Sequence, residues 1–186
     1  MSMNKEKRKV EETFEKLVMS HYQRIFNYIY MLTNDYELSK DLTQDTFVKA
    51  YVSFKKLRKK AAFPLWIMRI ARNLSINRMR KEHLRRTRFI SLFTKKYEGE
   101  LQDSLSDPIS PLIENAEKKE KKNIVRKALY EIPQRMREAL ILKEWENLSY
   151  EEIGKVMKIS RKAVKSLIHR ARETIRKKLV KKDAFR

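Results

Sequence analysis

Two serine residues in the last quarter of the chain stand where helices are expected to begin, and they constrain the fold more than any other feature. Ser149 precedes Glu152 by three residues, the spacing of a capping box in which each side chain accepts a hydrogen bond from the other residue's backbone N–H. Ser160 is placed to cap a second helix after about two turns of the first. A short helix, a tight turn and a longer helix predict a helix-turn-helix over residues 147–180, with the second helix in the major groove of duplex DNA.

The helix that follows Ser160 has one apolar and one polar face. The apolar residues span about 80° at 100° per residue, so we expect them to pack on a core; they are Val164, Ile168, Ala171, Ile175 and Leu179. The first two turns of such a helix meet base edges, and arginines at the margins hold phosphates. The alternative is a solvated basic face. The candidate contacts to DNA are Ser160, Arg161, Lys162, Lys165, Ser166, His169, Arg170 and Arg172.

Composition extends the helical expectation to the whole chain. Only 2 glycines and 4 prolines occur among 186 residues, and helix formers such as Lys, Glu and Leu dominate. The sequence therefore predicts an all-α protein.

The net charge of +21 predicts a polyanionic partner, most often nucleic acid. Its distribution is uneven, because residues 1–90 carry +12, residues 91–117 carry −4 and residues 118–186 carry +13. The middle stretch also holds two prolines and a glycine. We therefore predict two small helical domains, residues 1–90 and 118–186, joined by an acidic linker, residues 91–117.

Several classes of protein are disfavoured. The chain has no cysteine, which excludes disulfides and Cys-ligated zinc and suits a cytoplasmic location. No signal peptide is visible, and no apolar run reaches the ~18–20 residues that span a bilayer, so we expect no membrane insertion. The three histidines lie far apart, and the glycines, at 99 and 154, cannot form a phosphate loop. We expect no enzymatic activity, no metal and no cofactor.

The N-terminal block is expected to contain three helices. Apolar residues recur at three- and four-residue steps, and proline is tolerated in a first turn. The predicted helices are residues 11–33, 36–57 and 63–83, with breaks at 33–35 and 55–62. The apolar stripe of the second helix comprises Leu38, Leu42, Phe47, Val48 and Tyr51. In the C-terminal block, residues 112–132 and 133–145 are also expected to be helical.

The third helix carries a polar face that suits nucleic acid. Its members lie four, four and three residues apart and so share one side; they are Arg69, Asn73, Asn77 and Arg80. The basic loop before this helix ends beside Phe63 and Trp66. Basic residues interleaved with aromatic rings suit single-stranded nucleic acid, whereas the alternative places both rings in the core.

Two long motifs resemble those of bacterial sigma-70-type factors. Residues 41–50 (DLTQDTFVKA) and 63–74 (FPLWIMRIARNL) resemble region 2 of that family. Residues 150–154 (YEEIG), together with matching positions over residues 159–172, resemble region 4. The resemblance covers about residues 14–88 and 118–180. With only two regions and a short connector, the chain is similar to the extracytoplasmic-function group.

The resemblance implies a transcription initiation factor that binds core RNA polymerase and directs it to promoters, melting the minus-10 element and reading the minus-35 element as duplex. Region 2 binds the β′ clamp in this family and region 4 touches the β flap; an anti-sigma factor is a further candidate partner. The positions matching the polymerase contact are Asp41, Leu42, Gln44, Asp45 and Phe47, where the alternative assigns Leu42 or Phe47 to the core. The minus-10 candidates are Lys59, Lys60, Phe63, Trp66, Arg69, Asn73, Asn77 and Arg80.

The sequence departs from the family pattern in and after the turn. Lys158 stands where glycine is common and costs roughly 1 kcal/mol if its backbone is left-handed. Leu167 stands where arginine is common, so a packing contact is expected in place of a phosphate contact. Arg161-Lys162-Ala163 replaces the usual small residues and threonine, which should alter the preferred promoter sequence.

A stand-alone helix-turn-helix regulator of transcription is the alternative from another class. It would leave residues 41–47 and the polar face of the third helix without a function.

Overall fold

The structure is helical in both blocks. This computed structural model describes residues 2–57, 59–93 and 125–183, and within these ranges there is no strand, which confirms the all-α prediction. The N-terminal helices are α1 (Ser2–Thr33), α2 (Tyr36–Ser53) and α3 (Phe63–Phe93), with short 3-10 helices at Phe54–Lys56 and Lys60–Ala62. Residues 125–130 are helical and precede α5 (Gln134–Glu144), α6 (Tyr150–Met157) and α7 (Arg161–Asp183). The predicted linker and the helical pattern from residue 112 lie outside the described residues over 94–124.

Local chemistry accounts for the helix boundaries. Asn34 has φ 58° and ends α1, and the Asp35 side chain caps α2 by accepting from the Leu38 N–H at 2.9 Å, which confirms the predicted break. Three predicted ends were wrong, because α1 begins at Ser2, α2 ends at Ser53 and α3 continues to Phe93. The extensions of α1 and α3 contain no glycine or proline, so nothing in them stops a helix.

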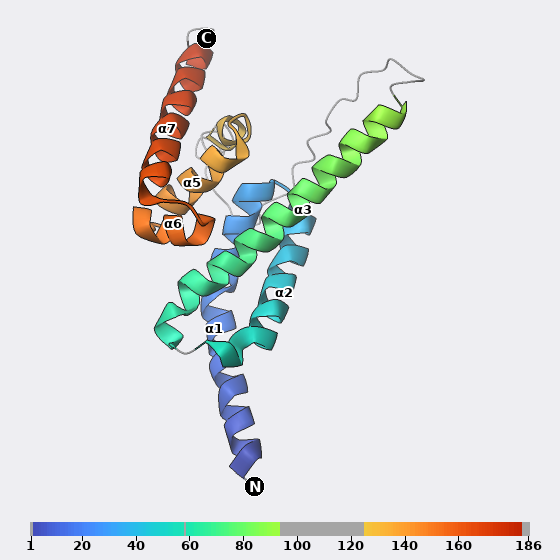
Figure 1. Cartoon of the computed structure of the whole chain (residues 1–186), viewed down its shortest axis with the longest axis vertical. Coiled ribbons are helices and arrows are strands. Elements are labelled where there is room, and N and C mark those ends of the chain that lie inside the picture. The colour runs from blue at the N-terminus through green and yellow to red at the C-terminus, as the bar shows by residue number, and fades with distance from the viewer. Residues whose placement is uncertain (1, 58, 94–124, 184–186) are drawn as a thin grey trace, which may run out of the picture.

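Helices α1, α2 and α3 pack side by side (Figure 1). Ile29 and Leu32 of α1, Ala50 of α2 and Ile67 of α3 are fully buried between them. One end of this bundle is closed by an aromatic cluster, in which the rings of Phe14, Phe54 and Phe63 meet edge to face with centroids 5.1–6.3 Å apart.

The C-terminal helices form a second group with its own buried residues. Ile141 and Leu142 of α5, Ile153 of α6 and Val164 and Ile168 of α7 are buried together. Helix α5 also lies against α1, and α6 lies against α3, so the two helix groups are in direct contact.

Candidate nucleic-acid interface

The start of α6 has the predicted capping box. The Ser149 N–H donates to the Glu152 carboxylate at 2.8 Å, and the Ser149 hydroxyl accepts from the Glu152 N–H at 3.3 Å. Hydrogen bonding to the Glu152 carboxylate by Ser149, first from its backbone N–H, holds the pKa of that carboxyl below its ordinary value. The helix-turn-helix therefore begins at the residue that the sequence indicates.

The turn between α6 and α7 depends on two backbone features. Lys158 adopts the left-handed conformation, with φ 56° and ψ 50°. This conformation costs a lysine residue roughly 1 kcal/mol, as the sequence analysis anticipated for a left-handed backbone here. A Cβ atom added at Gly154 would lie 2.8 Å from the carbonyl oxygen of Ile159, which is too close for any other residue without movement. The turn thus folds back tightly over Gly154, and α7 begins directly beside α6.

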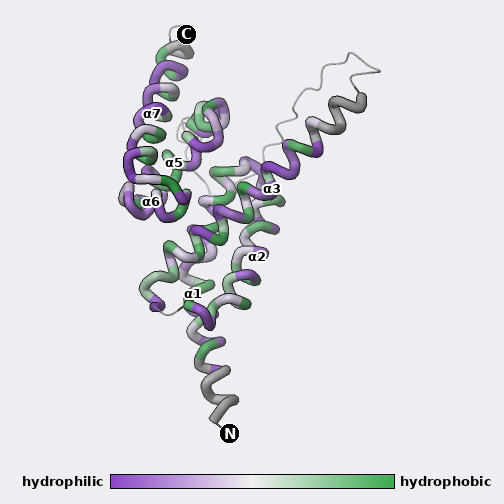
Figure 2. The backbone as a smooth tube through the Cα atoms, in the orientation of Figure 1, coloured by the Kyte–Doolittle hydropathy of each residue, from purple (hydrophilic) through white to green (hydrophobic). Residues whose placement is uncertain are grey.

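Helix α7 has the two faces that the sequence predicts. The Ser160 hydroxyl accepts from the Ala163 N–H at 3.2 Å, as expected of a cap. Val164, Ile168 and Ala171 are buried, and Leu167 packs against the core as predicted. The tube in Figure 2 shows α7 as mostly hydrophilic with apolar positions between. The opposite face is exposed at Lys162, Lys165, Ser166 and His169, which places all four on one accessible surface.

Two arginines at the margins of this surface are already paired, which the sequence analysis missed. Arg161 pairs with Glu151 of α6 at 2.9 Å, and Arg172 pairs with Glu144 of α5 at 2.5 Å. Hydrogen bonding to Glu144 raises the pKa of Arg172. Arg170, also exposed, donates to the carbonyl of Ser166 at 3.4 Å. Any contact of Arg161 or Arg172 with a phosphate must therefore share or replace a carboxylate.

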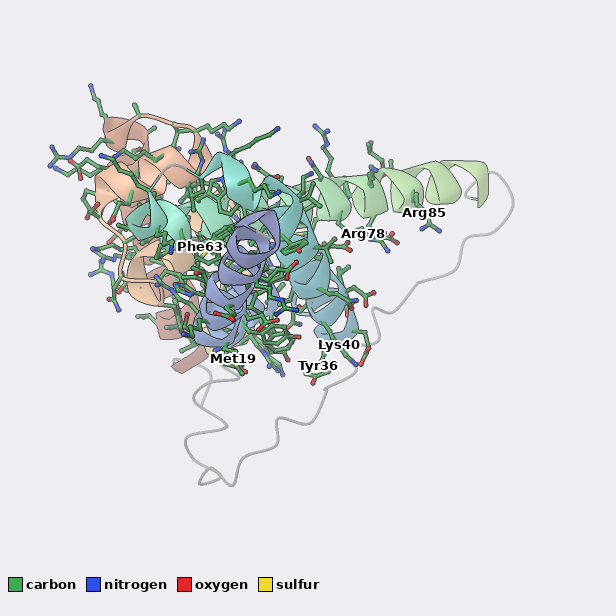
Figure 3. The ribbon with its side chains drawn as sticks, turned by 90° about the horizontal axis from the view of Figure 1, so that it is seen from below. Met19, Tyr36, Lys40, Phe63, Arg78 and Arg85 are labelled. Atoms are coloured by element: carbon green, nitrogen blue, oxygen red, sulfur yellow. The ribbon has the colours of Figure 1, made fainter. Side chains whose placement is uncertain are left out.

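The polar face of α3 is accessible along its length. Arg69, Asn73, Asn77 and Arg80 are all exposed, and so are Lys59 and Lys60 in the preceding segment. Figure 3 shows Arg78 and Arg85 projecting from the part of α3 that extends beyond the bundle. At 100° per residue, these two arginines lie on another side of α3 than Arg69, Asn73, Asn77 and Arg80.

Of the two predicted aromatic contacts, Phe63 belongs to the core. It is 0% exposed and packs edge to face on Phe14, Phe54 and His21. The prediction that its ring contacts DNA was wrong for this structure, because no surface of the ring is available. Trp66 is half-buried beside it, with centroids 5.8 Å apart, and keeps an accessible part.

Helix α2 divides the predicted polymerase contacts into two sets. Asp41, Gln44 and Asp45 are exposed, whereas Leu42 and Phe47 are buried at 5% and 7% exposure. The assignment of Leu42 and Phe47 to a polymerase surface was therefore wrong; Phe47 stacks on Tyr22 of α1 instead.

The exposed side of α2 also contains apolar residues that the sequence analysis did not place there. Val48 is 58% and Val52 is 76% exposed, although Val48 and the 47% exposed Tyr51 were predicted to line the buried stripe. Positions 41, 45, 48 and 52 follow one another at helical spacing, a signal that was present in the sequence. We call Asp41, Gln44, Asp45, Val48 and Val52 the α2 face.

The described residues offer no group of three or more His, Cys, Asp or Glu placed to hold a metal ion. In that same part of the chain, each helix is too short or too polar to cross a membrane.

These observations define an all-helical protein in which a helix-turn-helix packs against a three-helix bundle, and the comparisons with known proteins identify its family. A Sigma-70 region 2 family model matches residues 17–85, and a Sigma-70, region 4 model matches residues 122–175. The RNA polymerase sigma factor YlaC of Bacillus subtilis is 32% identical over 93% of this chain and 95% of its own. The chain therefore belongs to the sigma-70 family of transcription initiation factors, in its extracytoplasmic-function group.

Other relatives agree with this family. The ECF RNA polymerase sigma factor SigW of Bacillus subtilis is 29% identical, over 91% of this chain and 90% of its own. The sigma factor RpoE from Bartonella quintana, solved in complex with the anti-sigma factor NepR, shares the fold with a TM-score of 0.69 at 21% identity, covering 90% of this chain and 97% of that one.

Proposed function

We propose that this sigma factor binds core RNA polymerase through the α2 face and holds promoter DNA at two places. The exposed residues at the start of α7 read the minus-35 element as duplex, and the polar side of α3 melts the minus-10 element. The observation that carries this proposal is the coexistence of two separate exposed basic surfaces, on α7 and on α3, in one chain of net charge +21.

The minus-35 contact is supported by the geometry of α7. Lys162, Lys165, Ser166 and His169 lie on the first turns of a capped second helix, where base edges are read in this motif. Lysine pairs with guanine acceptors. We expect Arg170 to hold a phosphate directly, and Arg161 and Arg172 to do so by sharing or replacing Glu151 and Glu144.

The minus-10 contact is supported by the α3 surface. Arg69, Asn73, Asn77 and Arg80 offer donors and acceptors to unstacked bases, and Lys59 and Lys60 offer charge to the backbone. Trp66, with its accessible edge, replaces Phe63 as the ring on which a base stacks. Unstacking costs a few kcal/mol per step, which a preformed surface offsets.

The polymerase contact combines charge with apolar area. Val48 and Val52 offer apolar area for the centre of a protein interface, and Asp41 and Asp45 beside them offer charge for its polar rim. We assign the β′ clamp to this face and the β flap to the C-terminal block. The same proposal includes the division into residues 1–90, 91–117 and 118–186, a cytoplasmic location and the absence of enzymatic activity. It also includes an anti-sigma factor as a further partner.

A binding experiment with and without core polymerase tests it. We expect tight, sequence-specific binding to promoter duplex only when core polymerase is present, because each DNA surface alone makes few contacts. Equally tight binding by the chain alone would indicate a stand-alone regulator and would overturn the proposal.

A further inference from the structure

The turn between α6 and α7 contains a lysine in a backbone conformation that lysine rarely adopts. Three residues of the described chain, none of them glycine, have a positive φ: Asn34 at 58°, Asn147 at 53° and Lys158 at 56°. Asparagine tolerates the left-handed region, because its short polar side chain forms hydrogen bonds with the nearby backbone. Lysine has no such local compensation, so the strain at Lys158 is not offset within the turn.

The turn requires this conformation whichever residue stands at position 158. The N–H groups of Lys158 and Ile159 both donate to the Gly154 carbonyl, the second at 3.0 Å, and these bonds close the end of α6. Glycine adopts the left-handed conformation without strain and is common at this position in the family. This chain therefore has a lysine where a smaller and less strained residue would form the same turn.

A strained residue that the fold does not need indicates a function for its side chain. The Lys158 side chain is exposed, and its ammonium group has neither an ion-pair nor a hydrogen-bond partner among the described residues. The ammonium group therefore adds no polar contact to the folded chain. A ligand outside the chain would explain why the strain is kept.

Lys158 lines a shallow hollow of about 510 Å³ on the outer side of the turn. Lys155 of α6 and Arg161 at the start of α7 line the same hollow, together with the carboxylate of Glu151. Arg161 pairs with Glu151 at 2.9 Å, so the positive charges of Lys155 and Lys158 remain in excess there. The hollow is therefore suited to an anion.

The hollow lies at the end of α7 that meets DNA in a helix-turn-helix. In this motif the first helix crosses the phosphate backbone, and the first turns of the second helix enter the major groove. The junction of the two helices thus lies at the edge of the groove. Lys162 and Lys165 continue the exposed positive charge from the hollow onto α7. The anion that this position favours is a phosphate of the DNA backbone.

We propose that Lys158, with Lys155 beside it, binds a backbone phosphate of the minus-35 duplex, an inference that rests on the function proposed above and deepens it. The contact adds affinity without sequence information, because the phosphates are alike at every base pair. It also holds the start of α7 in one register against the duplex. A glycine at position 158 forms the turn but cannot make this contact, so the contact is an addition of this chain to the common pattern.

Lys158→Gly tests the proposal, because it should stabilise the fold and weaken DNA binding at the same time. The full chain with core polymerase is titrated against a duplex promoter fragment, obtained by run-off transcription, over a range of NaCl concentrations. At about 0.1 M NaCl we expect roughly three- to tenfold weaker binding, and a slope of log affinity against log salt that is shallower by about 0.9. A fragment with base changes in the minus-35 element should lose the same factor, as a phosphate contact predicts. The midpoint of thermal unfolding should rise by about 2–4 °C.

Three variants are matched controls. Asn147→Gly replaces another left-handed residue without a change of charge, so promoter affinity should not change. Lys177→Ala removes one exposed charge late in α7, and the salt slope should not change. Lys158→Arg keeps the charge and should keep both the affinity and the slope. An equal loss of affinity in Lys177→Ala would overturn the proposal, because any exposed charge would then have the same effect.

Lys158→Asn is a second variant that separates the charge from the turn. Asparagine tolerates the left-handed conformation but has no charge, so binding should weaken as in Lys158→Gly. Equal affinity and equal salt slope for the unchanged chain and both uncharged variants would overturn this inference alone. No promoter binding by the unchanged chain with core polymerase would overturn the proposed function and this inference with it.

Discussion

The C-terminal and N-terminal blocks differ in how their surfaces relate to their cores. In α7 the buried residues Val164 and Ile168 lie opposite the exposed Lys165 and His169. In α2 the buried side includes the polar Thr43 and Thr46, and the exposed α2 face includes the apolar Val48 and Val52. Both helices separate core from surface by face, but the polarity of the residues marks those faces only in α7.

The largest expected effect is a loss of stability on changing Phe63 of α3, which lies in the core. Phe63→Ala should lower the free energy of unfolding by about 3–5 kcal/mol, because it leaves a cavity beside the rings of Phe14 and Phe54. Urea denaturation of the full chain measures this, with the half-buried Trp66→Ala as the control that loses less. A small loss of stability combined with a large loss of promoter opening would indicate that Phe63 contacts DNA and would contradict its assignment to the core.

The next largest effect is expected on core polymerase binding, when a residue of the α2 face is changed. Asp45→Lys should weaken binding to core polymerase at least about tenfold, because it places a positive charge beside Val48 in the proposed contact. Fluorescence titration with labelled core polymerase measures the change. The matched control is Glu15→Lys on α1, an exposed position outside the α2 face, which should bind normally. Normal binding by the Asp45 variant would remove this assignment.

Helix α7 allows a test of its exposed polar face. Lys165→Ala combined with His169→Ala should weaken use of the minus-35 element by about 1–3 kcal/mol while leaving stability almost unchanged, since both side chains are exposed. Transcription from a native promoter measures the effect. Lys177→Ala, later on the same helix, serves as the control. If both variants behave alike, the first turns of α7 have no special role.

The smallest effect lies in the turn. Lys158→Gly should stabilise the chain by about 1 kcal/mol, because glycine adopts the left-handed conformation without strain. Lys155→Gly, inside α6, should have the opposite sign and cost about 1 kcal/mol. Equal signs in urea denaturation would contradict the account of this turn.

Much of the fold follows from local chemistry and could therefore be predicted from the sequence. The break at Asn34 and the caps at Ser149 and Ser160 each involve residues within three or four positions of one another. The start of α1 and the end of α3 were not predictable, because charged stretches without a breaker carry no boundary signal.

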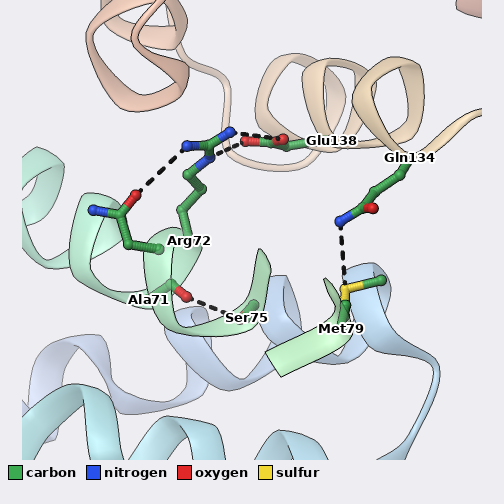
Figure 4. Close-up of polar contacts among 7 residues, drawn as sticks. Ala71, Arg72, Ser75, Met79, Gln134 and Glu138 are labelled. Atoms are coloured by element: carbon green, nitrogen blue, oxygen red, sulfur yellow. Dashed lines mark hydrogen bonds and ion pairs between the residues drawn. The ribbon is translucent and has the colours of Figure 1, made fainter. Parts of the chain in front are cut away.

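The errors at the candidate site have a different origin. In α2 the polarity of a residue does not indicate whether it is buried. Val52 is 76% exposed, whereas Thr43 and Thr46 are 0% exposed and their hydroxyls donate to backbone carbonyls one turn earlier. The pairing of Arg72 with Glu138 (Figure 4) joins residues 66 positions apart. No local pattern encodes such a contact, so only the folded chain shows it.

Run-off transcription with purified core polymerase across genomic fragments tests the central claim most directly. The account predicts defined transcripts only when both the chain and the polymerase are present, with permanganate-reactive thymines at the minus-10 element. It also predicts that Asn73→Ala with Asn77→Ala removes this reactivity while duplex binding persists. No defined transcript, or reactivity at the wild-type level in that variant, would contradict the account.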